Sequence, residues 1–167
     1  MVLSDDSPPE APELEVSRWF NTPSPLTLAG MRGEVVAIEA FQMLCPGCVL
    51  HGIPQAKRLH AAFGDELRVI GLHTVFEHHD AMQPVSLEAF LHEFGVGFPV
   101  GVDAHDEVGG PPVTMQRYGL RGTPSLVLVD RAGRVRFERL GQVDDLELGS
   151  HVTRLLDEAP PPTHGDP

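Results

Sequence analysis

Basic residues are scarce in this sequence. The chain holds 12 Lys and Arg residues against 24 Asp and Glu residues, a formal net charge of -12. Nucleic acids and anionic membrane surfaces attract positive charge, so this composition argues against both as partners. No apolar run approaches the ~20 residues that cross a bilayer, and the first residues lack the basic start and apolar core of a secretory signal. We therefore expect a cytoplasmic protein without a membrane span; an exported protein whose signal has been removed is the alternative.

Cysteine is rarer still, and the two that occur, Cys45 and Cys48, stand close together. Structural zinc usually has four ligands, so without a second cysteine pair it would need histidines such as His51. Covalent haem attachment would need histidine where Val49 stands, which excludes that group. A fixed structural disulfide is a further alternative, although closing so small a loop removes little chain entropy and stabilises a fold only modestly.

The position of the cysteine pair indicates a reactive role. The pair follows the apolar run 35–41, where a buried strand would end and a helix begin. At a helix N-terminus the unpaired N–H groups and the helix dipole stabilise a thiolate, and the second thiol lies within disulfide reach. The sequence therefore predicts thiol–disulfide exchange.

Glu39 interrupts that apolar run, six residues before Cys45. A carboxyl within a buried strand is desolvated, which raises its pKa into a range suited to proton transfer. Alternatively, on an edge strand with one solvated face, Glu39 would point to solvent.

Pro124 stands just before the strand-like run 126–129. Proline has no N–H to donate to a sheet, so it belongs at the first position of a strand or in a special turn, of which a cis peptide bond is one kind. Alone, the dipeptide Thr123-Pro124 is weak evidence for such a turn. The cysteine pair earlier in the chain makes it more informative.

This order of motifs resembles the thioredoxin superfamily. The resemblance covers residues 13–158 and looks closest to the redoxin branch, which contains the alkyl hydroperoxide reductase and thiol-specific antioxidant relatives and the thioredoxin-like reductases of cytochrome maturation. Segments 26–36 and 118–124 resemble the lead-in and the cis-proline segment of that branch. Leu44 departs from the tryptophan that is common before the first cysteine, so we expect an aliphatic rim.

The resemblance implies a role for each motif residue. Cys45 would attack a substrate disulfide, and Cys48 would resolve the mixed disulfide. Glu39 would accept the proton of Cys48, while Thr123 and Pro124 would position the substrate backbone. The substrate would be a protein or small-molecule disulfide, a separate reductant or oxidant would recycle the pair, and neither a cofactor nor a metal is expected.

The implied fold is α/β, a central mixed β-sheet flanked by helices, with an N-terminal hairpin and a helix–strand insertion. Periodicity and turn signals place the hairpin at 14–20 and 26–28, strands at 35–41, 67–75 and 98–103, two antiparallel strands around 132–133, and helices from the cysteine pair to Phe63, from 86 to 94 and from 144 to 157. Ser86 is the expected N-cap of the second helix. Residues 1–12 and 159–167 are rich in proline and acid, so we expect them to be disordered on either side of one domain, 13–158.

Two other functions stay open. A peroxidase of the peroxiredoxin type would use Cys45 to attack peroxide. That family places proline and threonine seven and three residues before this cysteine, where this chain has Ile38 and Gln42, and Arg121 is badly placed to replace its arginine. The other alternative is a non-enzymatic module that binds a soft metal through both thiols and His51. Otherwise we expect His51 to be exposed.

Overall fold

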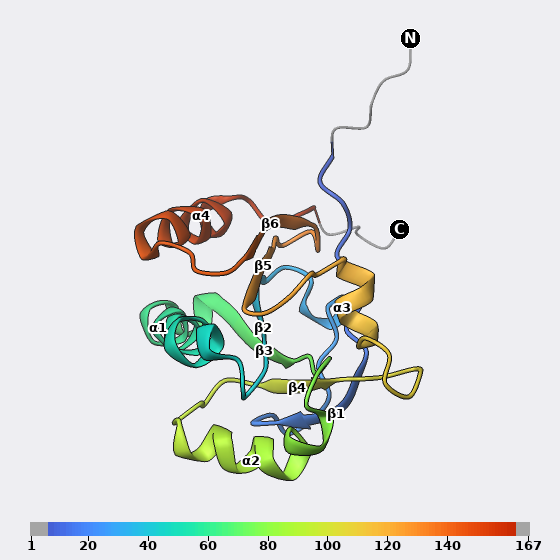
Figure 1. Cartoon of the computed structure of the whole chain (residues 1–167). Helices are drawn as coiled ribbons and strands as arrows, with labels where there is room; N and C mark the ends of the chain where they lie inside the picture. Colours follow the sequence, from blue (N-terminus) through green and yellow to red (C-terminus); the bar gives the residue numbers. More distant parts are fainter. Residues whose placement is uncertain (1–6, 163–167) are drawn as a thin grey trace.

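The computed structural model describes residues 7–162. In this part of the chain a six-stranded mixed sheet has the order β1-β4-β3-β2-β5-β6 (Figure 1). Its strands are β1 (Val16–Phe20), β2 (Val35–Phe41), β3 (Leu67–His73), β4 (Val100–Asp103), β5 (Ser125–Val129) and β6 (Val135–Leu140). The α-helices are α1 (Ile53–Phe63), α2 (Pro84–Glu93), α3 (Val113–Tyr118) and α4 (Asp145–Asp157). The predicted mixed sheet flanked by helices is confirmed.

The central strand β2 explains where the site lies. It pairs parallel with β3 and antiparallel with β5, and all of its residues are buried. Val35, Ala37 and Phe41 belong to the apolar core that includes α1 and α4, whereas Val36 and Ile38 belong to the core on the opposite face. Figure 1 shows α1 and α4 on one side of the sheet and α3 on the other. Because side chains alternate along a strand, Glu39 falls on the α1 side.

The predicted N-terminal hairpin is wrong. β1 pairs antiparallel with β4, far along the chain, and 26–28 leads into a 3-10 turn, Ala29–Met31. Gly101 permits the β1 contact, because a Cβ there would lie 2.8 Å from Val16 Cγ2. The insertion of α2 and β4 between β3 and β5 creates a sheet edge, and β1 covers it.

The helix–strand insertion itself is confirmed, although its helix begins earlier than expected. α2 starts at Pro84, with Gln83 rather than Ser86 at the N-cap position. Proline suits the first helical position because its missing N–H would have no partner inside the helix. The last helix, α4, was expected over 144–157 and runs from Asp145 to Asp157. Asp144 is its N-cap, a role that was not predicted from the sequence; its carboxylate accepts hydrogen bonds from the N–H groups of Leu146 and Glu147.

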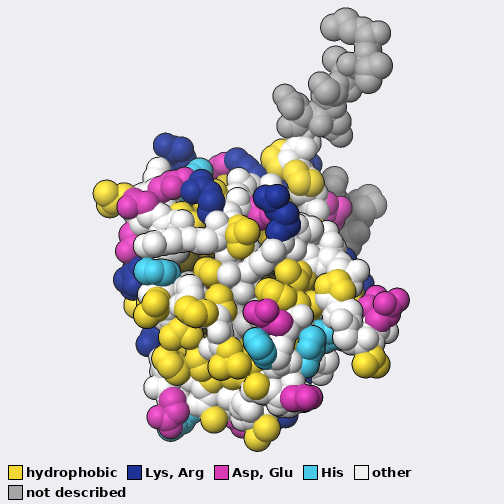
Figure 2. All heavy atoms as spheres, in the orientation of Figure 1, with side chains coloured by type: hydrophobic (Ala, Val, Ile, Leu, Met, Phe, Trp, Pro, Cys, Tyr) yellow, Lys and Arg dark blue, Asp and Glu magenta, His cyan; other side chains and the backbone are white. Residues whose placement is uncertain are grey.

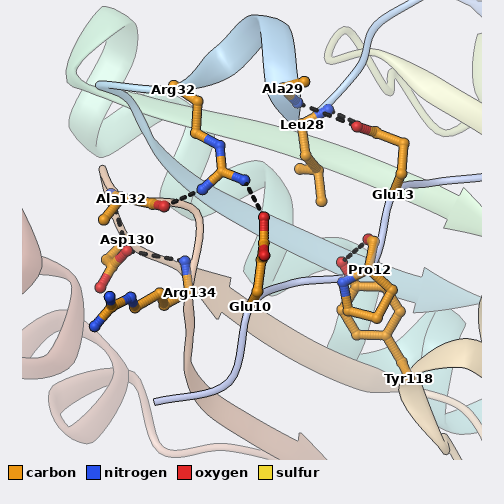
Figure 3. A network of polar contacts seen from close by, with 10 residues as sticks. All are labelled: Glu10, Pro12, Glu13, Leu28, Ala29, Arg32, Tyr118, Asp130, Ala132 and Arg134. Atoms are coloured by element: carbon orange, nitrogen blue, oxygen red, sulfur yellow. Dashed lines mark hydrogen bonds and ion pairs between the residues drawn. The ribbon is translucent and has the colours of Figure 1, made fainter. Parts of the chain in front are cut away.

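Part of the N-terminal segment expected to be disordered is held against the sheet. The N–H of Ala11 donates to the Gly133 carbonyl over 2.9 Å. The Arg32 guanidinium joins the Glu10 carboxylate, 2.7 Å away, to the carbonyl of Ala132 (Figure 3). These contacts join residues far apart in sequence, so composition alone did not reveal them, and the ordered part begins before residue 13. Residues 1–6 and 163–167 of the expected disordered ends lie outside the described residues.

The helices offer no membrane anchor within the described range. None of those found in residues 7–162 is both long and apolar enough to cross a bilayer.

Candidate active site

The two cysteines form a disulfide where β2 gives way to helix. Their Cα atoms are 5.2 Å apart. Helical backbone starts at residue 46, continues as a π-helical turn over Cys48–Gly52 and then becomes α1. Cys45 therefore directly precedes the first helical residue, at the positive end of the helix dipole, as the sequence predicts.

The two sulfurs differ in access. Cys48 is fully buried, whereas Cys45 is partly exposed. The N–H of Cys48 donates to Cys45 Sγ over 3.2 Å. After reduction, this N–H and the helix dipole would stabilise a thiolate on Cys45. The geometry thus offers Cys45 to solvent and keeps Cys48 behind it.

The Thr123-Pro124 peptide bond is cis and lies against the disulfide. The Thr123 carbonyl oxygen is 3.5 Å from Cys45 Sγ. A Cβ at Gly47 would lie 3.2 Å from Pro124 Cδ, so the proline ring packs on the loop between the cysteines. The fold thus brings together the two motifs that the sequence singled out.

Glu39 is buried behind the site, with an exposed fraction of 2%. Burial, which desolvates the charged form, raises its pKa to about 8. Its Oε1 has no hydrogen-bond partner among the described residues. The alternative that Glu39 faces solvent is wrong, because β2 is the central strand and is covered on both faces.

Gly52 gives the Glu39 carboxyl its place. A Cβ at Gly52 would collide with Glu39 Oε1 and lie 2.9 Å from Pro124 Cβ. The carboxyl therefore lies against the helix backbone four residues after Cys48 and beside the cis-proline. A side chain at position 52 would push these groups apart.

A cavity of about 300 Å³ reaches this carboxyl from the side of α1 and the β6–α4 connection. Its lining comprises Glu39, Leu50, His51, Gly52, Gln55, Arg58, Leu126, Gly141, Gln142, Val143, Asp144 and Asp145. His51 is exposed, as expected, but it also lines this cavity, which the sequence did not indicate.

Gln42 is a site residue whose part the sequence did not reveal. Its buried side chain donates from Nε2 to Thr123 Oγ1 over 3.4 Å and accepts at Oε1 from the N–H of Phe76 over 3.2 Å. Gln42 thereby ties the cis-proline segment to the loop after β3. The available signal in the sequence was a polar residue directly after the apolar run of β2. Its hydrogen-bond partners, Thr123 and Phe76, come from distant segments and could not be predicted from that signal.

His73 holds the loop before the cysteines through a hydrogen bond to its backbone. It is buried, and its Nε2 accepts from the Met43 N–H over 3.3 Å. Burial lowers its pKa to about 4, so the imidazole is neutral at physiological pH. Across the described part of the chain, no three His, Cys, Asp or Glu side chains are grouped so that they could hold a metal ion.

The rim of the site is aliphatic, as expected from Leu44 at the position before Cys45 where tryptophan is common. Leu44 is 56% exposed and Leu50 is 68% exposed. Figure 2 shows hydrophobic side chains gathered on this face of the molecule, over the region between α1 and α2. An apolar surface around a reactive disulfide suits contact with a polypeptide.

Known proteins that are similar to this chain indicate the family to which it belongs. No family model matches the chain. Protein DipZ of Mycobacterium tuberculosis is 30% identical over 155 residues, which cover 90% of this chain and 21% of DipZ. The chain thus spans about a fifth of the length of that relative.

Two solved structures are similar over almost their whole length. A thiol-disulfide isomerase from Corynebacterium glutamicum is 50% identical, with a TM-score of 0.85, over 89% of this chain and 98% of that one. A thioredoxin-like superfamily protein is 57% identical, with a TM-score of 0.88, over 91% of this chain and 99% of that one. Such identity over whole chains, together with the C-x-x-C disulfide against a cis-proline, means that this chain belongs to the thioredoxin-like superfamily.

Proposed function

We propose that this protein is a thiol–disulfide oxidoreductase that works through Cys45 and Cys48. The observation that carries the proposal is the disulfide itself. It lies at a helix N-terminus and against a cis-proline, with one sulfur accessible and the other buried. The isomerase from Corynebacterium glutamicum, which is 50% identical, supports the same chemistry.

In the reducing direction, the Cys45 thiolate attacks one sulfur of a substrate disulfide. A Cys45–substrate disulfide forms, the substrate S–S bond breaks, and the other substrate sulfur leaves as a thiolate that takes a proton from solvent. Cys48 then gives its proton to ionised Glu39 and attacks Cys45 Sγ. The mixed disulfide breaks, the second substrate sulfur leaves as a thiolate, and the Cys45–Cys48 disulfide forms. The substrate gains the two electrons that the cysteine pair loses.

The residues around the pair would serve this exchange. The backbone of Thr123 and Pro124, beside Cys45 Sγ, is placed to hydrogen-bond an extended substrate segment. The exposed aliphatic rim would contact the apolar side chains of that segment. A polypeptide disulfide is thus the favoured substrate, and a separate dithiol or disulfide recycles the pair.

The direction of exchange depends on where the protein works. A cytoplasmic location, which the sequence predicts, favours substrate reduction because that compartment keeps thiols reduced. An exported location, the alternative, would allow oxidation or isomerisation. A few tens of millivolts between the pair and its surroundings decide the direction.

The residues around Cys45 favour a peroxidase less than a thiol–disulfide oxidoreductase. Gln42 stands where peroxiredoxins have threonine, and both ends of its amide are hydrogen-bonded within the protein. Ile38 stands where they have proline and belongs to the core on the other face of the sheet. Cys45 therefore lacks these two groups of the peroxide pocket.

The test compares two substrates for the reduced protein. We expect rapid reduction of insulin disulfides with a recycling dithiol, and reaction with hydrogen peroxide no faster than that of an ordinary thiolate. Turbidity follows insulin reduction, and stopped-flow mixing with a sulfenic-acid probe follows peroxide. Oxidation several orders of magnitude faster than a free thiol, with little insulin reduction, would instead establish a peroxidase.

A further inference from the structure

We propose that the cavity lined by Glu39 and His51 is the route by which Glu39 exchanges protons with solvent, and that the exposed His51 accepts and returns the proton. This inference rests on the proposed function, in which Glu39 takes the proton of Cys48. His51 would act as a positioning residue, through Glu39, without touching the substrate.

The cavity meets the physical requirements of such a route. Its volume of about 300 Å³ is ample for water molecules, each of which occupies about 30 Å³ in the liquid. Its wall includes the buried Glu39, whose Oε1 has no hydrogen-bond partner among the described residues. The lining also includes the exposed His51. A buried acid, a hydratable space and an exposed imidazole thus share one cavity.

Glu39 needs a proton acceptor because burial raises its pKa to about 8. At neutral pH most of this carboxyl is protonated, so it must lose its proton before it can accept another from Cys48. A weak acid releases its proton slowly to water alone, because the release rate falls with its acid dissociation constant. A nearby base speeds that release.

The other charged groups that line the cavity cannot supply this base near neutral pH. Asp145 accepts from Gln55 Nε2 over 2.8 Å and pairs with Arg58, and these contacts hold its pKa below the usual range. Asp144 is engaged as the N-cap of α4. Arg58 is a cation without a proton-accepting site. Imidazole is the side chain whose titration ordinarily lies in this pH range.

The local backbone relates Glu39 to His51 through Gly52. The Glu39 carboxyl lies against Gly52, as shown by the collision that a Cβ there would cause. His51 is the preceding residue in the same helical turn. The first turns after Cys48 therefore carry both the surface against which the acid rests and the proposed base.

The experiment measures the reaction of pre-reduced protein with a peptide disulfide by stopped flow, in weak buffer, from pH 6 to 9. We expect His51→Asn to react about 10-fold more slowly than the wild type near pH 6.5, a modest general-base effect. The deficit should shrink above pH 8, where Glu39 is increasingly ionised. Added imidazole should restore the rate of the variant and leave the wild type unchanged. His92→Asn, at an exposed position on α2, is the matched control and should behave as the wild type.

Two results would overturn the inference while leaving the proposed function intact. One is a His51→Asn variant that matches the wild type at every pH in weak buffer. The other is a slow variant that imidazole does not restore, because that would indicate a structural role. A wild type that fails to react with the disulfide in any buffer would overturn the proposed function, and the inference with it.

Discussion

At the scale of single residues, the site contains a carboxyl, that of Glu39, whose charged form is disfavoured by burial. Glu39 has a folded pKa of about 8 against an ordinary value of 4.5. Between these values the folded chain binds this proton more tightly than the unfolded chain does. The contribution of Glu39 to folding is therefore fully present below pH 4.5 and is lost as the pH rises through 8.

Glu39→Gln should remove this pH dependence. We expect the free energy of unfolding of the variant, relative to the wild type, to rise from pH 5 to pH 9 by an amount on the order of a few kcal/mol. His73, with its lowered pKa, titrates in both proteins and cancels in the difference. The variant should also turn over ~10²-fold more slowly at neutral pH, because it cannot accept the Cys48 proton.

Urea denaturation across this pH range checks the stability, and insulin reduction checks the turnover. Glu138→Gln, at an exposed position on β6, is the control and should change neither. Parallel stability curves for Glu39→Gln and the wild type would show that the carboxyl is not buried in the folded protein.

At the scale of elements, the close packing of the first helical segment on β2 holds the site together. Gly52 marks the contact, since any side chain there meets Glu39 and Pro124 at once. Gly149, within α4, offers the opposite case, because a Cβ there would have no atom within 4 Å.

Gly52→Ala should therefore destabilise the fold by about 1–3 kcal/mol, the usual cost of overpacking. Its insulin reduction should also fall, because the carboxyl or the cis-proline must move. Gly149→Ala should instead gain ~0.5–1 kcal/mol, because alanine favours the helix. Thermal or urea denaturation with the insulin assay compares the two. Equal stability changes in both variants would mean that the helix does not approach β2 as described.

Elements with strong local signals were predictable from the sequence. The bounds of β2 follow from its apolar run, which only Glu39 interrupts, and those of α4 from its apolar spacing. The candidate site was predictable because Cys45-Pro-Gly-Cys48 and Thr123-Pro124 each carry a backbone reason for their position.

Features that depend on distant contacts were not predictable. α3 is only six residues long, and its first N–H groups are satisfied by Asp103, which accepts from Thr114 over 2.8 Å and from Met115 over 3.0 Å. The partner of β1 is decided by which sheet edge stays open after the insertion. The meeting of His51 and Glu39 at one cavity depends likewise on how the first helical segment packs on the sheet.

At the scale of the whole molecule, an acidic body carries a reactive pair within an apolar rim. The chain has a net charge of -12, while the exposed Leu44 and Leu50 leave an apolar approach to Cys45. In the proposed function, this rim would contact the substrate and the chemistry would be carried out by two sulfurs of unequal access.

We propose that Cys45 attacks the substrate and that Cys48 resolves the mixed disulfide, and trapping of the mixed disulfide distinguishes these two roles. Reduced Cys48→Ser and Cys45→Ser proteins are each mixed with one peptide disulfide, and the adducts are quantified by intact mass. From this assignment of roles we predict a stable adduct on Cys48→Ser, because Cys45 is accessible and no thiol remains to release the peptide. We predict little adduct on Cys45→Ser, whose remaining thiol is buried. Equal adducts on both variants, or an adduct on Cys45→Ser alone, would contradict it.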